Sequence, residues 1–173
     1  MNTFAHIKHI GAYDKVSYYS VVVENDEHSL FEDFIAQHKH TNKEKLYHIV
    51  KWLEVIGKKY GAQTNLFRPE GKNADTSALP PAENRNPSYI ENGKKKANAL
   101  RLYCLRANSN VVFLFNGDIK TTQKAQDCPN VSKHFKLANQ ISKALNQAFI
   151  EKDILWNETL TDIVFQTDLM IHF

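Results

Sequence analysis

Two helix-start signals, twelve residues apart, constrain the fold of this chain more than any other feature. Residues 29–32 (SLFE) and 41–44 (TNKE) both have the form of a capping box, in which a hydroxyl caps the amide three residues on and the acid reaches back. Apolar residues then follow a helical period over 30–35 and again over 46–60. The sequence therefore predicts two successive helices, joined by a few polar residues into a helical hairpin.

Four further segments have the composition of β-strands. Residues 16–23 are β-branched and aromatic between polar neighbours, and residues 4–10 predict a shorter strand before them. Residues 100–105 (LRLYCL) and 111–115 (VVFLF) flank a polar turn, which predicts a second pair of strands. After them, Pro129 precedes one apolar stripe that predicts a helix ending near residue 150.

This order of elements predicts an α+β fold in which helices pack on a small antiparallel sheet. Residues 1–150 form the expected domain. Within it, residues 62–98 are interrupted by proline and glycine, which predicts a long loop of the kind that is often functional. Residues 151–173 form an acidic extension whose pattern fits either a helix or a strand.

The charge of the chain is distributed unevenly. Residues 1–150 hold 21 Lys and Arg against 14 Asp and Glu, whereas residues 151–173 hold one base against five acids. A basic body suits a polyanionic ligand, although modest asymmetry is also common in proteins that bind none. Neither a membrane span nor a secretory signal is evident, so a soluble cytoplasmic protein is expected.

The histidines and cysteines do not form a recognisable metal or nucleophile motif. The pairs at residues 6 and 9 and at residues 38 and 40 lack further ligands at metal-binding spacing, which favours structural or surface roles. Cys104 and Cys128 cannot form a disulfide framework. Cys128 stands near a predicted helix start, where the pKa of a thiol can be lowered, but an inert thiol is the simpler interpretation.

The strongest candidate site lies on the predicted hairpin at 100–115 and the polar segment after it. Arg101 and Tyr103 alternate with apolar neighbours, Arg106 ends the first strand, and Lys120 and Lys124 follow the second. Such cations can hold a phosphate and stabilise a phosphoryl-transfer transition state, and an exposed tyrosine can stack on a base. The simpler alternative is the solvated face of a sheet that is packed on one side only.

Four short segments give the chain a resemblance to a known family. They are residues 65–72 (NLFRPEGK), 100–106 (LRLYCLR), the strand VVFLF and residues 120–124 (KTTQK), followed by a helix after an Asp-x-Pro turn. In this order they resemble the RelE/HigB-like toxins of bacterial type II toxin–antitoxin modules, over roughly residues 4–150. The resemblance implies a RelE-like fold and a ribosome-dependent mRNA endonuclease.

The resemblance also implies roles for individual residues, with no metal or other cofactor. The 2′-hydroxyl of the RNA attacks the adjacent phosphate while basic side chains stabilise the negative charge. The implied catalytic positions are Arg101 and Lys120, with Arg106 at the strand end and His134 as the nearest group to move a proton. The implied RNA-binding residues are Arg68, Lys72, Tyr103 and Lys124, together with Lys94, Lys95 and Lys96, which are assigned from charge.

Two points distinguish this chain from the pattern and keep a second function open. Gln123 and Ala125 stand where relatives often have an arginine and an aromatic residue, and the loop at 73–98 is long. The alternative is an inactive or ParE-like binding module that contacts a protein target or an antitoxin. In either case the expected partner is an antitoxin, typically with a helix-turn-helix, and the nuclease would also contact the ribosome and mRNA.

The extension at 151–173 allows several hypotheses. It could cover the basic face, imitate an antitoxin, or bury Trp156 in a homodimer. The simpler expectation is an extra helix or strand that completes the core.

Overall fold

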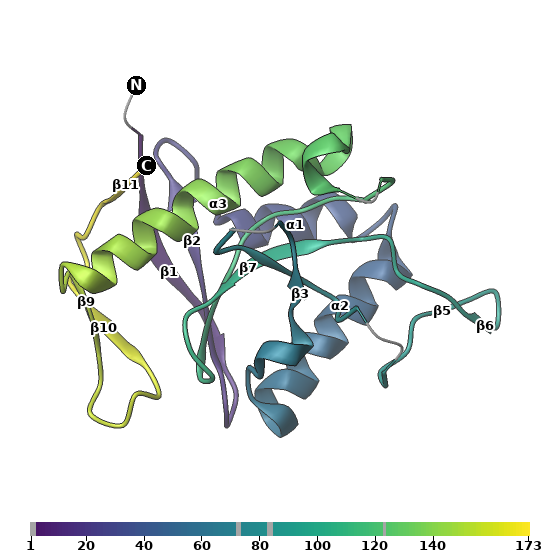
Figure 1. Ribbon diagram of the computed structural model, residues 1–173, viewed down its shortest axis with the longest axis horizontal. Helices are drawn as coiled ribbons and strands as arrows, with labels where there is room; N and C mark the ends of the chain where they lie inside the picture. The colour runs from purple at the N-terminus through teal and green to yellow at the C-terminus, as the bar shows by residue number, and fades with distance from the viewer. Residues whose placement is uncertain (1–2, 72–73, 83–84, 123) are drawn as a thin grey trace.

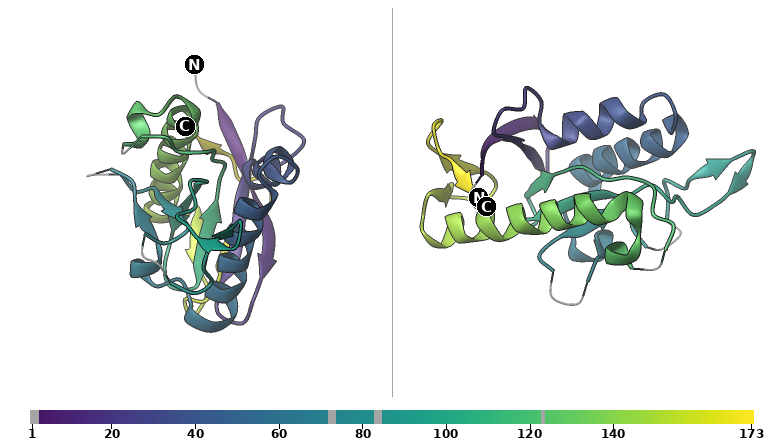
Figure 2. Two further views of the ribbon diagram at one scale, coloured as in Figure 1. Left: turned by 90° about the vertical axis from the view of Figure 1, so that its right-hand side faces the viewer. Right: turned by 90° about the horizontal axis from the view of Figure 1, so that it is seen from above.

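A seven-stranded sheet separates two helical layers in the computed structural model, which describes residues 3–71, 74–82, 85–122 and 124–173 (Figure 1). Helix α3 covers one face of the sheet, and α1 and α2 cover the other (Figure 2). The helices are α1 (Leu30–His38), α2 (Lys43–Val55) and α3 (Pro129–Ile150), with short turns η1 (Ile56–Tyr60), η2 (Thr64–Leu66) and η3 (Ala125–Asp127). The strands are β1 (Phe4–Ala12), β2 (Ser17–Val23), β3 (Arg68–Pro69), β4 (Ser77–Leu79), β5 (Ile90–Glu91), β6 (Lys94–Lys95), β7 (Leu102–Arg106), β8 (Val111–Leu114), β9 (Ile154–Trp156), β10 (Ile163–Phe165) and β11 (Ile171–His172).

The sheet is mixed and larger than the sequence predicts. Its strand order is β11-β1-β2-β8-β7-β4-β3, and every pair is antiparallel except β2 with β8. The α+β class is confirmed, but the expectation of a small antiparallel sheet is wrong. The chain between β2 and β8 is long enough to bring β8 back in the same direction as β2, so this pair is parallel. The sheet is larger because β3, β4 and β11 also join it.

The two predicted helix starts behave differently. Ser29 caps α1 through the Glu32 amide, and the Glu32 carboxylate accepts from the Ser29 amide, so the first capping box is confirmed. The second is wrong, because α2 begins after Asn42 and has no side-chain cap. The Asn42 amide instead contacts His38 Nδ1 at 2.8 Å, which ties the end of α1 to the start of α2.

Both faces of the central strand β7 are buried, because each faces a helical layer. Leu102 and Cys104 pack toward α1 and α2, while Tyr103 and Leu105 belong to the core beneath α3. Tyr103 is 0% exposed and its ring lies 5.7 Å from that of Phe135 on α3. The expectation of a polar, solvated face on this strand is therefore wrong, and Tyr103 cannot stack on a base from solution.

The predicted loop at 62–98 contributes to the sheet. Ala78 of β4 pairs with Tyr103 of β7, and Arg68 of β3 pairs with Ala78, so this region supplies two strands at the sheet edge. Further along, β5 and β6 form a separate two-stranded hairpin that projects from one end of the molecule (Figure 2). Proline and glycine hid these elements because the strands are only two or three residues long.

The C-terminal extension completes the core. Strands β9 and β10 pair with each other, and β11 adds to the sheet beside β1. Ile154, Ile163 and Ile171 are buried in the core beneath α3. These strands and buried side chains confirm the simplest expectation, an extra element that completes the core. The segment lies at the end of the molecule opposite the β5–β6 hairpin (Figure 1).

Candidate functional site

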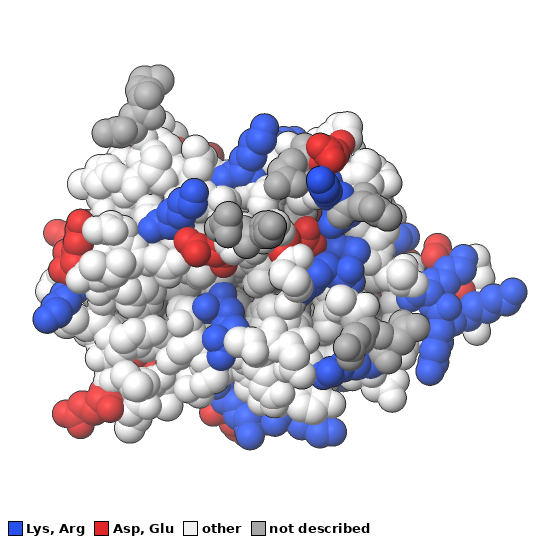
Figure 3. All heavy atoms as spheres, in the orientation of Figure 1, with Lys and Arg blue, Asp and Glu red and all other residues white. Residues whose placement is uncertain are grey.

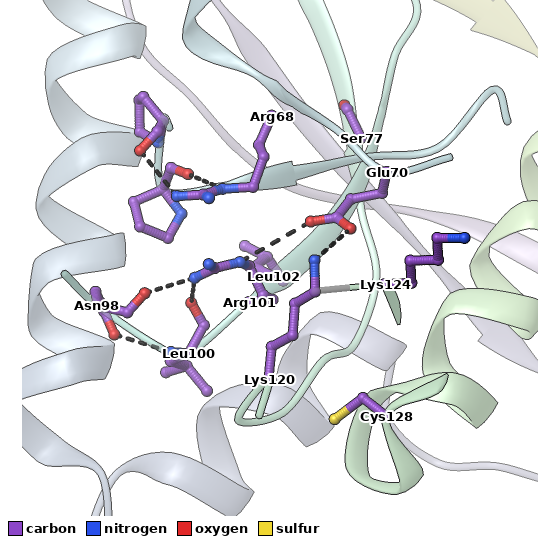
Figure 4. A network of polar contacts seen from close by, with 12 residues as sticks. Arg68, Glu70, Ser77, Asn98, Leu100, Arg101, Leu102, Lys120, Lys124 and Cys128 are labelled. Atoms are coloured by element: carbon purple, nitrogen blue, oxygen red, sulfur yellow. Dashed lines mark hydrogen bonds and ion pairs between the residues drawn. The ribbon is translucent and has the colours of Figure 1, made fainter. Parts of the chain in front are cut away.

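Arg101 and Lys120 converge on one carboxylate, that of Glu70 (Figure 4). Lys120 Nζ lies 3.1 Å from Glu70 Oε2, and Arg101 Nε lies 3.9 Å from Glu70 Oε1. The two cations come from adjacent backbone segments, the arrangement that binding of one phosphate by both would need. The anion between them belongs to the protein itself.

The cations are brought together because the ladder between β7 and β8 continues past the ends of both strands. The Arg101 amide donates to the Asp118 carbonyl at 3.0 Å, and the Lys120 amide donates to the Ala99 carbonyl at 2.8 Å. Gly117 makes this possible, because a Cβ atom there would lie 1.8 Å from the Arg101 carbonyl oxygen. At Gly117, shortly after β8, the backbone thus lies too close to that of Arg101 to leave room for a side chain.

Glu70 reaches the cluster from the sheet edge, directly after β3. The Arg68 guanidinium donates to the carbonyls of Pro80 and Pro81, which holds the start of this strand beside the residues after β4. Arg101 is fixed in a similar way, because its Nη1 donates to the carbonyls of Asn98 and Leu100. Backbone carbonyls therefore orient both arginines, and the carboxylate lies where their positive charges act.

The cluster is almost completely buried. The exposed fraction of the side chain is 3% for Glu70 and 11% for both Arg101 and Lys120. Burial, followed by the charge of Arg68, lowers the pKa of Arg101 to about 10, against the opposing effect of Glu70. Arg101 remains a cation at neutral pH. Charges in such a site interact more strongly than in water, and each needs a partner.

Three polar atoms of this region lack a hydrogen-bond partner among the described residues. They are Glu70 Oε1, Arg101 Nε and the Tyr103 hydroxyl. Burial raises the pKa of Tyr103, and so does the charge of Glu70, which keeps the hydroxyl protonated and able to donate. One acceptor and two donors among the described residues thus lack a hydrogen bond, although Arg101 Nε and Glu70 Oε1 form an ion pair with each other.

The other predicted catalytic residues do not join this cluster. Arg106 Nε donates to the Ala62 carbonyl, at the far end of β7. His134 lies on α3, where burial and then the charge of Lys133 lower its pKa. Asp118 and His38 also act on the His134 pKa, and its Nε2 has no hydrogen-bond partner among the described residues.

The predicted RNA-binding residues differ in exposure. Tyr103 is buried and Arg68 is half-buried, while Lys124 is exposed beside the cluster (Figure 4). The lysines at 94–96 are exposed on the β5–β6 hairpin and make it strongly basic (Figure 3). Lys72 lies outside the described residues.

The histidines predicted to be structural make hydrogen bonds to the backbone. His6 Nδ1 lies 2.9 Å from the Leu169 carbonyl oxygen, and His38 Nε2 lies 3.2 Å from that of Gly117. His38 is buried rather than solvated, because α1 ends against the segment that carries Gly117. Within the described part of the chain, no group of three metal-ligating side chains of the kinds Cys, His, Asp and Glu gathers.

Cys128 lies at the start of α3, one short segment away from Lys120. Burial raises the pKa of its thiol, but hydrogen bonds from the hydroxyl and amide of Thr121 and from the amides of Val131 and Asn130 outweigh this and lower the pKa to about 7. Cys128 is fully buried. The thiol is therefore polarised by its surroundings but shielded from reagents in solution.

Glu70 is the residue of this site that the sequence analysis missed. It stands inside the segment NLFRPEGK, but a single carboxylate in a proline-containing stretch predicts nothing by itself. Its partner Lys120 is 50 positions away. No local signal identifies Glu70, because Arg101 and Lys120 approach it only in the folded chain.

None of the helices in the described residues is both long enough and apolar enough to cross a membrane. The chain matches no protein-family model, and neither a curated protein nor a solved structure shows significant similarity to it.

Proposed function

We propose that this chain is the toxin of a toxin–antitoxin module and cuts ribosome-bound mRNA without a metal, by attack of the RNA's own 2′-hydroxyl. The observation that supports the proposal is the Glu70 carboxylate held between Arg101 and Lys120. A base flanked by two cations in a buried site is the set of groups that this reaction needs. The RelE-like arrangement of the fold and an antitoxin partner are parts of the same proposal.

Each side chain has a defined step in the proposed reaction. Glu70 Oε1 accepts the proton of the 2′-hydroxyl while the bond from that oxygen to phosphorus forms. Arg101 donates to the phosphate oxygens, on which negative charge develops. The bond to the 5′-oxygen then breaks, and this oxygen takes a proton from the Lys120 ammonium.

The proton balance closes within the cluster. Lys120 Nζ is 3.1 Å from Glu70 Oε2, so the neutral amine can recover a proton from the protonated carboxyl group. The products are a 2′,3′-cyclic phosphate and a free 5′-hydroxyl. No oxidant, cofactor or external acid enters this scheme.

The alternative is a binding module without nuclease activity, and one observation favours it. Glu70 neutralises both cations, and all three side chains are buried. In that case the cluster serves to join β3, β7 and the segment around Lys120, and the protein acts by binding a protein target or an antitoxin. The two functions make opposite predictions for transcript cleavage.

Expression of the intact chain in bacteria tests the proposal. We expect growth arrest with transcripts cut during translation, and loss of both effects in the Arg101→Ala, Lys120→Ala double variant, because the negative charge on the phosphate is then unopposed. The ends of the cut transcripts are mapped by primer extension. Circular dichroism verifies that the variant is folded.

The matched control is the Lys136→Ala, Lys143→Ala variant, which removes two exposed cations from α3. It should cut transcripts like the unmodified chain. Growth arrest by the intact chain with uncut transcripts and altered DNA supercoiling would contradict the nuclease and support the alternative.

A further inference from the structure

A groove between α2 and the segment that leads into β5 has no role in the proposed chemistry. Its volume is about 430 Å³, within the range of small-molecule sites. We call it the α2 groove and define it by six of the side chains that line it: Lys43, Tyr47, His48, Lys51, Tyr89 and Ile90.

Flat and apolar surfaces are available in the α2 groove. Tyr47 is 68% exposed and Ile90 is 47% exposed. Tyr89 is buried, and its ring lies 5.6 Å from that of His48, so the two rings form a fixed floor. The groove therefore offers an exposed aromatic ring, that of Tyr47, on which a planar ligand can stack.

The floor is preorganised by hydrogen bonds. His48 Nε2 donates to the Pro87 carbonyl at 2.9 Å, and His48 Nδ1 accepts from the Asn98 side-chain amide at 3.0 Å. These two bonds require a neutral imidazole, and burial lowers the pKa of His48 in agreement. The ring orientation is thus set before any ligand arrives, which reduces the entropy lost on binding.

The surroundings of the α2 groove are basic. Lys43 and Lys51 line it, Lys45 Nζ lies 5.8 Å from the centre of the Tyr89 ring, and the lysines at 94–96 project beside it on the hairpin (Figure 3). The acids nearby are fewer. Glu44 lines the groove, Glu54 lies 3.5 Å from Lys51, and Glu91 lies 3.8 Å from Lys96. Among the described residues, six lysines against three acids leave an excess of positive charge for an anion.

Asn98 connects the α2 groove to the Glu70 cluster. Its side chain donates to His48 and to the Lys45 carbonyl, and its own backbone carbonyl accepts from Arg101 Nη1. Adjacent to the groove, a smaller cavity of about 50 Å³ shares His48 and Tyr89 with it and is also lined by Arg68 and Lys96. Basic side chains therefore line the small cavity next to the α2 groove as well.

From this arrangement we infer that the α2 groove binds an unpaired base of single-stranded RNA, with Tyr47 stacking on the base and Lys43 and Lys51 contacting the flanking phosphates. Aromatic rings interleaved with lysines are the usual means by which proteins hold single strands, whereas a duplex does not present the faces of its bases. The inference deepens the proposed function, on which it rests for the choice of RNA as ligand.

The test is fluorescence anisotropy with a labelled 2′-O-methyl RNA of about 10 nucleotides, which the proposed reaction cannot cut. We expect Tyr47→Ala to weaken binding about tenfold and Tyr47→Phe to bind within about twofold of the unmodified chain, because the ring is retained. Lys43→Gln with Lys51→Gln should reduce the slope of log K against log salt by about 1.4. The matched control is Tyr13→Ala, which removes a different exposed tyrosine, whose ring lies beneath Lys58.

Three results would overturn the inference. The first is RNA binding that Tyr47→Ala leaves unchanged, and the second is an equal loss in Tyr13→Ala. The third is tighter binding of a fluorescent oligoglutamate peptide than of the RNA, which would assign the groove to an acidic protein partner. Because the probe is not cleavable, Tyr47-dependent binding without any cleavage of natural transcripts would retire the nuclease and leave the RNA site standing.

Discussion

The two basic regions of this molecule differ in how their charge is compensated. At the Glu70 cluster, two cations are buried and share one carboxylate of the chain. Around the α2 groove, six lysines stand near the surface, and only part of their charge meets an acid. A buried cation needs a counterion from the protein itself, whereas an exposed cation is solvated and remains available to bind an external anion. The first region therefore suits chemistry or structural support, and the second suits binding.

Removal of the shared anion should produce the largest effect on stability. Glu70→Ala leaves Arg101 and Lys120 buried without a counterion, so we expect a loss of about 3–5 kcal/mol in the free energy of unfolding. Chemical denaturation followed by circular dichroism measures it. Lys95→Ala, on the exposed hairpin, should change the same quantity by less than about 0.5 kcal/mol.

A double-mutant cycle sharpens this result. Glu70→Ala and Lys120→Ala should show a coupling energy of about 1–3 kcal/mol, because each substitution removes one partner of the same buried ion pair. Additive losses would mean that the two side chains stabilise the fold independently. The buried region would then resemble the exposed one.

A smaller effect is expected for the two buried thiols, whose pKa values differ. Hydrogen bonds from uncharged groups offset the effect of burial on the thiolate of Cys128 but not on that of Cys104. Burial raises the pKa of Cys104 to about 12, whereas hydrogen bonds from Thr121 and the start of α3 outweigh burial and lower that of Cys128 to about 7. Thiolate absorbance at 240 nm should therefore titrate with a midpoint near 7. Cys128→Ser should abolish this transition, and Cys104→Ser should keep it.

The same thiol links stability to pH. The folded-state pKa of Cys128 is lower than its ordinary value, so the unfolded chain holds more protons between the two values. The contribution of the thiolate is fully present above the ordinary pKa and is lost as the pH falls through about 7. A melting temperature of the Cys104→Ser variant that does not fall over this range, relative to Cys128→Ser, would contradict the assignment.

Local signals in the sequence predicted the long elements well. The Ser29 capping box starts α1, and the stripe after Pro129 gives α3 its full length. Short-range chemistry decides these features, so a single sequence contains them. The signal at Thr41 did not place the cap, because the residue before α2 is Asn42, whose side chain contacts His38 instead of capping the helix.

The site was predictable only in part, because it depends on contacts between distant segments. The sequence pointed to Arg101 and Lys120, and both belong to one cluster. It did not reveal Glu70, since nothing in a local pattern shows that the end of β3 lies beside residues 100–120. Tyr103 was misjudged for a related reason, because alternation predicts an exposed face only where no second helical layer covers the sheet.

Single-turnover cleavage of a message bound to the ribosome tests the role of Glu70 most directly. Glu70→Gln keeps the size of the side chain but cannot accept the proton of the 2′-hydroxyl, and Glu158→Gln, on the exposed C-terminal hairpin, is the control. We predict that Glu70→Gln cuts at least roughly 100-fold more slowly than the unmodified chain, while Glu158→Gln cuts at the same rate. Equal rates for Glu70→Gln and the unmodified chain, with both proteins folded, would show that the carboxylate between the two cations is not the base.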